Sequence, residues 1–180
     1  MSKDKTVLDV YSYVGGWGVQ AAVAGAKSVT CIDASGDALD LAQQNAELNN
    51  YRGPFSCLQG KANDIMKALV DAGQMFDVVV LDPPAFIKRK KDQRQGEKAY
   101  HQANQLALRL LSPGGILVSA SCSMHLSQPM LMEVVKTAAA HRHRQLQVFS
   151  LGGQGPDHPI HPAIPETNYL KAIFARDLEN

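Results

Sequence analysis

Residues 76–86 read Phe76-Asp77-Val78-Val79-Val80-Leu81-Asp82-Pro83-Pro84-Ala85-Phe86. Four aliphatic residues in succession, from Val78 to Leu81, are typical of a β-strand that is covered on both faces. The two prolines that follow hold the backbone extended and donate no hydrogen bonds to a neighbouring strand, so the strand ends before them. This pattern indicates a parallel sheet with helices on both sides.

Apolar β-branched stretches alternate with amphipathic stretches of helical length on both sides of this strand. This alternation predicts one three-layer α/β domain over residues 1–180, with a mainly parallel sheet and right-handed crossovers. A turn is predicted at residues 113–115, and Asp37 is predicted to cap the second helix. The predicted strands are residues 6–10, 28–33, 55–59, 76–81, 116–121, 146–151 and 170–176, and the predicted helices lie near residues 16–24, 37–49, 64–72, 99–111 and 129–140.

The composition is that of an ordinary folded domain. The chain has 180 residues, of which 45% are hydrophobic and 19% charged, and its formal net charge is +1. These values argue against a disordered or coiled-coil protein, and no apolar run approaches the roughly 18 residues of a membrane span. The polar first residues lack the apolar core of a signal peptide, and the three cysteines show no CxxC pairing. We therefore expect a cytoplasmic protein without a membrane partner.

A glycine-rich turn follows the first predicted strand. Gly15, Gly16 and Gly18 let the backbone approach a ligand closely and open a helix whose N-terminus favours negative charge. The spacing does not match GxGxxG, which argues against a nicotinamide-dependent dehydrogenase. Turns of this kind also occur in proteins that bind no nucleotide, so the turn alone leaves both interpretations open.

Polar side chains follow the second and third predicted strands. Asp33 ends the second strand, where a carboxylate can accept hydrogen bonds from both hydroxyls of an adenosine ribose. Asn63 and Asp64 follow the third strand, where a side chain could bind the amino group of adenine, although Asp64 could also cap the next helix. Because the carboxyl ends of parallel strands share one edge of the sheet, these residues are predicted to lie near the glycine turn.

A second group of candidate residues follows the fourth and fifth predicted strands. Asp82, Pro83 and Pro84 form a rigid loop that presents a carboxylate, and Phe86 is expected to pack against a flipped base there. Cys122 follows the fifth strand at the same edge of the sheet, where a thiolate could act as a nucleophile. Both segments also have plain alternatives, since a proline-rich strand exit and a small buried cysteine are common.

The segment after Phe86 is basic. Residues 87–98 carry six basic and two acidic side chains, a local charge of +4 in a chain of overall charge +1. Such a run is often only a solvated loop, but beside the candidate centre it could contact phosphates of RNA without reading the base sequence. The side chains proposed for this role are Lys88, Arg89, Lys90 and Lys91. No His, Cys or carboxylate spacing indicates a metal site, so no metal is expected.

These stretches together resemble a class I S-adenosylmethionine-dependent methyltransferase domain, in particular the bacterial ribosomal RNA cytosine-C5 methyltransferases that carry a PUA domain. The resemblance covers nearly the whole chain, through VLDVYSYVGGWGVQAA, CIDASGDALDLAQQNAELN, FDVVVLDPPAF, LLSPGGILVSASCS, DHPI and YLKAIFAR. It implies a Rossmann-like, seven-stranded sheet of order 3-2-1-4-5-7-6 whose last strand is antiparallel.

The resemblance also implies a cofactor and site residues. S-adenosylmethionine would be the methyl donor, with S-adenosylhomocysteine as product, and ribosomal RNA would be the partner. Asp33 would bind the ribose, and Asn63 and Asp64 the adenine. The residues of the glycine turn and the neighbouring loop that would contact the cofactor are Asp9, Tyr11, Ser12, Tyr13, Gly15, Gly16 and Asp82. The residues that would contact the substrate are Pro83, Pro84, Phe86 and residues 88–91.

The implied reaction gives Cys122 and Asp82 distinct roles. The Cys122 thiolate would add to C6 of cytosine, and Asp82 would hydrogen-bond the N3 edge of the base. The domain would be a C-terminal catalytic part without the upstream RNA-recognition segments of the family. Two other functions remain open from the sequence: a ribosomal RNA methyltransferase that acts on a purine nitrogen and needs no cysteine, and a non-catalytic nucleotide- or RNA-binding scaffold of the same fold.

Overall fold

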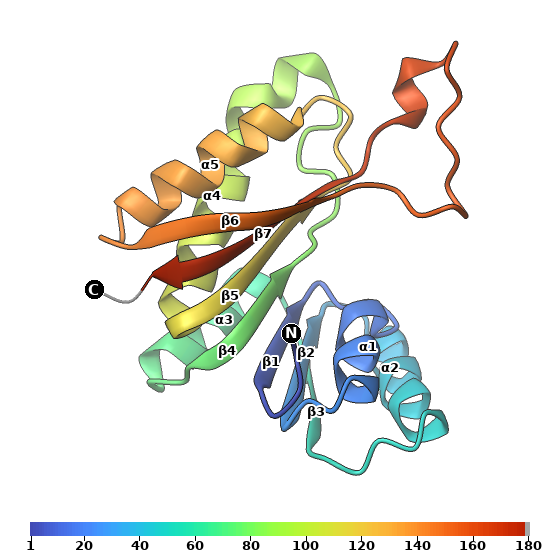
Figure 1. Cartoon of the computed structure of the whole chain (residues 1–180), viewed down its shortest axis with the longest axis vertical. Helices are drawn as coiled ribbons and strands as arrows, with labels where there is room; N and C mark the ends of the chain where they lie inside the picture. Colours follow the sequence, from blue (N-terminus) through green and yellow to red (C-terminus); the bar gives the residue numbers. More distant parts are fainter. Residues whose placement is uncertain (179–180) are drawn as a thin grey trace.

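The computed structural model describes residues 1–178 and contains one seven-stranded sheet (Figure 1). The strand order is β3-β2-β1-β4-β5-β7-β6, with β7 antiparallel to both of its neighbours. The predicted order and the antiparallel strand are therefore confirmed, and the fold is that of a Rossmann-like class I methyltransferase. The strands are β1 (Thr6–Val10), β2 (Ser28–Asp33), β3 (Phe55–Gln59), β4 (Phe76–Leu81), β5 (Leu111–Ser121), β6 (Gln145–Gly152) and β7 (Lys171–Leu178).

Helices cover both faces of the sheet, as the alternation of the sequence predicts (Figure 1). α1 (Gly16–Val23) and α2 (Gly36–Leu48) pack on the face formed by β1, β2 and β3. On the other face lie α3 (Ala62–Asp71), α4 (Gln93–Leu110) and α5 (Gln128–Ala140). Two short 3₁₀ turns, η1 (Lys90–Asp92) and η2 (Pro165–Thr167), lie in the connections.

The unbroken aliphatic run of β4 is explained by two hydrophobic cores. Successive side chains of a strand point to opposite faces. Val79 and Leu81 therefore enter the core beneath α3, α4 and α5. Val78 and Val80 enter the smaller core beneath α1 and α2. A polar side chain at any of these four positions would be buried without water, which is why all four are aliphatic.

Two predicted boundaries on the α4–β5 side are wrong. α4 begins at Gln93 rather than near residue 99, and β5 begins at Leu111 rather than at residue 116. Residues 113–115 do not separate a helix from a strand but form a bulge inside β5. Phe76 of β4 pairs with Leu111, whereas Val78 pairs with Ile116, and the intervening residues loop out with Gly114 at φ 70°.

The helix caps also differ from the prediction. α2 begins at Gly36, and the Oγ atom of Ser35 accepts the Ala38 N–H at 3.2 Å, so Ser35 and not Asp37 is the cap. Asp37 instead lies in the first turn, where a carboxylate is favoured by the helix dipole. α3 likewise begins at Ala62, and Asp64 occupies its first turn rather than its cap. Among residues 1–178, none of the helices has the length and apolar character needed to span a bilayer.

Candidate functional site

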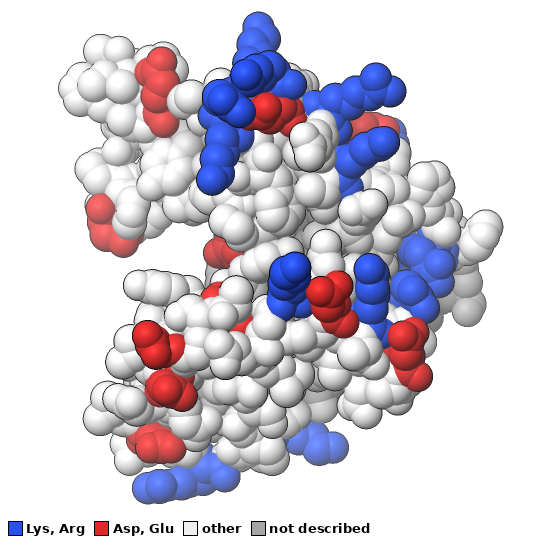
Figure 2. Space-filling model, turned by 180° about the vertical axis from the view of Figure 1, so that it is seen from behind, with Lys and Arg blue, Asp and Glu red and all other residues white. Residues whose placement is uncertain are grey.

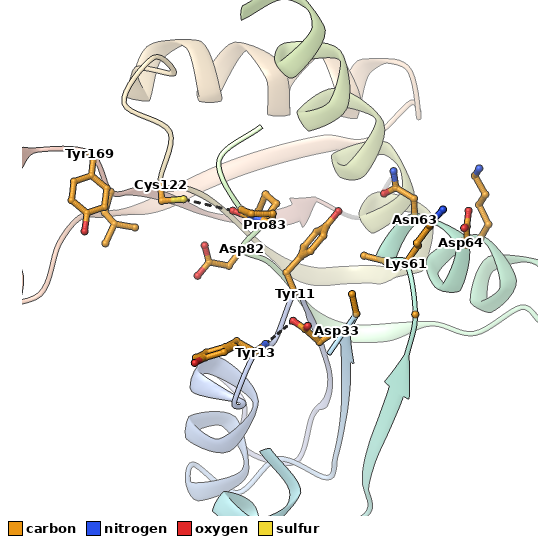
Figure 3. Close-up of a pocket in the computed structure, with 16 residues that line it drawn as sticks. Tyr11, Tyr13, Asp33, Lys61, Asn63, Asp64, Asp82, Pro83, Cys122 and Tyr169 are labelled. Carbon is orange, nitrogen blue, oxygen red and sulfur yellow. Dashed lines mark hydrogen bonds between the residues drawn. The ribbon is translucent and has the colours of Figure 1, made fainter. Parts of the chain in front are cut away.

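A large cavity lies at the carboxyl edge of the sheet, where the sequence placed the candidate residues. Its volume is about 1010 Å³. Figure 3 shows Cys122, Asp82 and Tyr169 toward one end and Asn63, Asp64 and Lys61 toward the other, with Tyr11 and Asp33 between them. The lining residues are Tyr11, Tyr13, Asp33, Ala34, Gly60, Lys61, Ala62, Asn63, Asp64, Lys67, Asp82, Pro83, Pro84, Cys122, Tyr169 and Leu170.

Asp9 lies beneath the glycine turn and does not line the cavity. One of its carboxylate oxygens, Oδ2, accepts the Gly18 N–H of α1 at 2.8 Å, and the other, Oδ1, is buried without a partner. Gly18 must be glycine, since a Cβ atom there would lie 2.8 Å from the Cys31 Sγ atom. Burial raises the pKa of Asp9 from 3.8 to about 7, and the nearby carboxylates Asp82 and Asp33 act in the same direction. Asp9 therefore anchors the turn and is not among the residues that line the cavity.

The raised pKa of Asp9 predicts a specific pH dependence of stability. Between pH 5 and 7 the folded protein keeps the Asp9 proton while the unfolded chain has lost it, so stability falls as pH rises through this range. Relative to Asp9→Asn, the wild type is expected to lose about 2–3 kcal/mol of unfolding free energy between pH 5 and pH 8, as measured by urea unfolding. Asp37→Asn, at an exposed position, is the control. Parallel profiles for wild type and Asp9→Asn would contradict this role.

Two tyrosines of the turn adopt a backbone conformation that favours glycine. Tyr11 has φ 65° and Tyr13 has φ 48°. The conformation is held by one backbone and one side-chain acceptor, since the Tyr11 N–H donates to the Ile32 carbonyl at 2.8 Å and the Tyr13 N–H donates to Asp33 Oδ2 at 2.9 Å. A non-glycine residue in this region costs on the order of 1–2 kcal/mol. Both side chains form walls of the cavity, which a glycine would leave open.

Asp33 is fixed at the end of β2 by two backbone groups. Oδ2 accepts the Tyr13 N–H and Oδ1 accepts the Ser35 N–H, each at 2.9 Å. A carboxylate has about four acceptor positions, so two hydrogen bonds leave capacity on both oxygens. The side chain lines the cavity, where it can accept two further hydrogen bonds from a vicinal diol.

The opposite end of the cavity is formed by the start of α3. Asn63, Lys61 and Asp64 line it together, and Asn63 Oδ1 is buried without a hydrogen-bond partner. An unpartnered acceptor beside a cavity fits a ligand that brings an exocyclic amino group, because pairing it removes a desolvation cost of about 1–3 kcal/mol. One cavity thus contains a carboxylate that can accept from a diol and an amide oxygen that can accept from an amino group, and this combination fits an adenosine group.

Asp82 and Cys122 lie at the end of the cavity nearest β4 and β5. Asp82 Oδ2 accepts the indole N–H of Trp17 at 2.9 Å, which fixes the carboxylate at the cavity wall. The Cys122 Sγ atom lies 3.9 Å from the Pro83 carbonyl, so the thiol and the Asp82–Pro83 segment are neighbours (Figure 3). Tyr169 is held beside them, because its N–H donates to Gln154 Oε1 at 2.7 Å.

A buried polar network joins the loop that carries Asp82 to the loop that carries Cys122. The Tyr100 hydroxyl bonds Ser121 Oγ at 2.8 Å and accepts the Phe86 N–H at 3.4 Å. The Ser123 hydroxyl donates to the Ile87 carbonyl at 2.6 Å. Ser121 and Ser123 flank the cysteine, so these bonds hold the sulfur in a fixed position relative to the Asp82 carboxylate.

Several predicted residues lie outside the cavity. The Phe86 ring packs on Tyr100, with ring centroids 4.8 Å apart, and lines a neighbouring hollow of about 510 Å³ together with Lys88 and Arg89. Arg89 pairs with Asp92 at 2.9 Å. Figure 2 shows basic side chains gathered at the end of the molecule where α4 begins. The predicted residues that do not line the cavity are Asp9, Ser12, Gly15, Gly16, Phe86, Lys88, Arg89, Lys90 and Lys91.

The sequence reasoning missed other residues of the cavity and its support. Lys61 and Lys67 come from the start and middle of α3, and Tyr169 precedes β7. Trp17, whose indole N–H donates to Asp82 Oδ2, lies in the glycine turn, and the local sequence gives no sign of this contact. An antiparallel strand begins at the edge of the sheet where the parallel strands end. The predicted antiparallel direction of β7 therefore indicates that the residues just before it, including Tyr169, lie at the same edge as the cavity. Within residues 1–178, no group of three His, Cys, Asp or Glu side chains is arranged to hold a metal ion.

The amino-acid sequence is similar to that of known methyltransferases over nearly its whole length. The chain is 42% identical over 175 residues to ribosomal RNA large subunit methyltransferase I of Aeromonas salmonicida (strain A449), covering 96% of this chain and 44% of that protein. It is 39% identical over 174 residues to the protein of the same name from Cronobacter sakazakii, covering 95% of this chain and 43% of that protein. The chain thus spans less than half the length of these curated relatives.

Solved structures and a family model agree with the fold. SMU.776, described as "a putative methyltransferase complexed with SAH", superposes with a TM-score of 0.84 at 20% identity over 97% of this chain and 46% of that one. A SAM-dependent methyltransferase from Agrobacterium tumefaciens superposes with a TM-score of 0.70 at 21% identity over 100% of this chain and 57% of that one. The model of the family named conserved hypothetical protein 95 matches residues 2–147, and the chain belongs to this family.

Proposed function

We propose that residues 1–180 form the catalytic domain of an S-adenosylmethionine-dependent methyltransferase that modifies C5 of a cytosine in ribosomal RNA. One observation carries the proposal: Asp33, Asp82 and Cys122, from the ends of three different strands, line a single cavity. The names of the sequence relatives, ribosomal RNA large subunit methyltransferase I, support the RNA substrate. An RNA substrate of this kind would be met in the cytoplasm.

The cavity residues fit the proposed methyl donor. Asp33 would accept hydrogen bonds from the two ribose hydroxyls, and Asn63 Oδ1 would accept the adenine amino group. Tyr11 and Tyr13 would enclose the part of the donor that lies over the turn. S-adenosylmethionine supplies a methyl group on a positively charged sulfur, which is ready for transfer to a nucleophile.

Cys122 would create that nucleophile. C5 of cytosine is a poor nucleophile until the Cys122 sulfur adds to C6 and the electrons of the C5=C6 bond move to C5. The activated C5 then takes the methyl group. Loss of the C5 proton to a base and cleavage of the C6–S bond restore the double bond and return the Cys122 thiolate. The sulfur ends as it began, so the residue acts as a covalent catalyst.

Asp82 would hold the base during this addition. Its Oδ2 atom is fixed by the Trp17 indole, and the carboxylate lines the cavity beside Cys122. In the adduct, N3 carries a proton that a carboxylate in this position can accept in a hydrogen bond, which stabilises the addition product. The buried hydrogen bonds of Tyr100 hold the loops that carry Asp82 and Cys122 in place. Less binding energy would then be needed to order these loops, and more would be available to orient the reacting groups.

Nucleoside mass spectrometry of ribosomal RNA tests the proposal. RNA is compared from cells that lack the intact gene and from the same cells rescued with wild type or Cys122→Ala, so the full chain is assayed. We expect 5-methylcytidine to fall in the deletion and to return only with wild type.

Two other results would overturn the assignment. A change in a methylated purine, with full rescue by Cys122→Ala, would identify a purine-nitrogen methyltransferase that uses the Asp82–Phe86 loop without a thiol. No change in any methylated nucleoside, together with no detectable binding of S-adenosylhomocysteine, would identify a non-catalytic scaffold.

A further inference from the structure

A lysine is buried behind the candidate centre. Lys171 is the first residue of β7 and pairs in register with Ser121 of β5, so the antiparallel strand brings it next to Cys122. Its exposed fraction is 8%, and it does not line the cavity. Lysine is rarely buried to this extent unless its charge is paired or hydrogen-bonded.

The Lys171 ammonium group holds the loop that follows Cys122. Its Nζ atom donates to the Ser123 carbonyl at 2.5 Å and to the Leu126 carbonyl at 2.6 Å. These two carbonyls bracket the turn immediately after the cysteine. The two Lys171 hydrogen bonds, together with the bond from the Ser123 hydroxyl to the Ile87 carbonyl, fix the backbone next to Cys122.

The charge of Lys171 lies beside the loop that carries Cys122. Across residues 1–178, the ion pairs of the structure include none between Lys171 and a carboxylate. Burial lowers the pKa of Lys171, and a negative charge on Cys122 acts in the opposite direction. The attraction between two opposite charges is reciprocal. If a thiolate stabilises the Lys171 ammonium group, the ammonium group stabilises the thiolate by the same free energy.

We propose that Lys171 is a positioning residue whose buried ammonium both anchors residues 122–126 and stabilises the negatively charged form of Cys122. The inference deepens the proposed function, on which its catalytic meaning rests. The sulfur must be negatively charged when it adds to C6 and becomes so again when the C6–S bond breaks. A fixed cation behind the loop favours both the start and the end of this cycle without occupying the space that the base requires.

Alkylation of Cys122 by two reagents tests the inference without RNA or methyl donor. Iodoacetate is negatively charged and iodoacetamide is neutral, and both react with a thiolate. The ratio of their rate constants therefore reports the local charge, because exposure of the sulfur and the fraction of thiolate affect both rates equally. Asp82 is present in every variant, so its repulsion of the charged reagent cancels. Rates are read for the Cys122 peptide by mass spectrometry, which excludes reaction at Cys31 and Cys57.

The full chain is compared with Lys171→Met and Lys171→Gln. Glutamine is neutral but retains N–H donors for the two carbonyls, whereas methionine has neither charge nor donors. We expect the rate ratio of iodoacetate to iodoacetamide to fall about fivefold in both variants. A role in loop anchoring alone would leave the ratio unchanged in Lys171→Gln, and that result would overturn the electrostatic part of the proposal.

A reciprocal measurement does not depend on the folding of a Lys171 variant. The Lys171 amine is titrated by NMR in wild type and in Cys122→Ala, which removes a half-buried side chain at the cavity wall. The pKa of Lys171 is expected to fall when the thiolate is absent, and an unchanged value would overturn the proposed pairing. Both experiments remain informative if ribosomal RNA analysis identifies a methylated purine, since they measure the Lys171–Cys122 interaction itself. Failure of the proposed function is therefore distinguishable from failure of this inference.

Discussion

Cys122→Ala is expected to lower the rate of methyl transfer by at least about a thousandfold while leaving donor binding nearly unchanged. Removal of a covalent nucleophile leaves C5 without an electron pair for attack, and loss of one member of a catalytic group commonly costs factors of this size. Cys122 lies toward the opposite end of the cavity from Asn63 (Figure 3), so the affinity for S-adenosylhomocysteine is expected to change less than threefold. Single-turnover kinetics and calorimetry separate the two effects.

Cys57→Ala is the matched control for Cys122→Ala. Cys57 lies on β3, its thiol donates to the Leu39 carbonyl at 3.5 Å, and it does not line the cavity. RNA that contains 5-fluorocytidine adds a direct test of the adduct, because fluorine at C5 is not released as a proton is. The wild type and Cys57→Ala should form a covalent complex that survives denaturation, and Cys122→Ala should form none. Covalent capture by Cys122→Ala would refute the nucleophile assignment.

Asp33→Asn is expected to weaken binding of S-adenosylhomocysteine about 30- to 150-fold. The carboxylate offers two charged acceptors to the ribose hydroxyls, whereas the amide offers one neutral acceptor and turns a donor toward the other hydroxyl. Loss of charge-assisted hydrogen bonds in a partly enclosed site costs about 2–3 kcal/mol. Calorimetric titration measures the effect directly, and the rate at saturating donor should fall far less than the affinity.

Asp37→Asn controls for the removal of a carboxylate from the same segment. Asp37 is exposed in the first turn of α2 and lies outside the cavity. Because Asp33 also accepts the Tyr13 and Ser35 N–H groups, thermal unfolding of each variant without ligand shows whether the turn is retained. Equal affinities for Asp33→Asn and wild type, with the turn intact, would place the ribose elsewhere in the cavity.

The architecture was predictable because burial on both faces leaves a clear pattern in the sequence. The bounds of β1 to β4 agree with the prediction, since each of these strands is set between turn residues. The start of α4 was missed because its first turn is polar, with only Gly96 buried where Ile87 and Phe86 approach the helix closely. The sequence predicts a turn where β5 has a bulge, because Pro113, Gly114 and Gly115 are residue types found in both.

The sequence predicts those residues of the candidate site whose position follows from the order of the strands, and not those whose position depends on tertiary contacts. Carboxyl ends of parallel strands share an edge, and this rule alone brought Asp33, Asp82 and Cys122 together. Phe86 follows the same rule, yet its ring packs between Tyr11 and Tyr100 and is not among the residues that line the cavity. That packing depends on Tyr100 of α4, 14 residues further along the chain, and no local sequence pattern shows that this helix turns back onto the loop.

Because β7 lies between β5 and β6 in the sheet, the order in which the strands are synthesised affects the order in which the sheet can form. β6 leaves the ribosome before β7, yet among the described strands it pairs with β7 alone, and β7 must insert between β5 and β6. Pairings of this kind close late, because distant segments must meet before any contact stabilises them. Tyr169 and Lys171 are synthesised with β7, so the loop that carries Cys122 has neither neighbour until this strand has been made. A nascent chain would therefore pair β1 to β5 first and complete the surroundings of Cys122 only when β7 inserts.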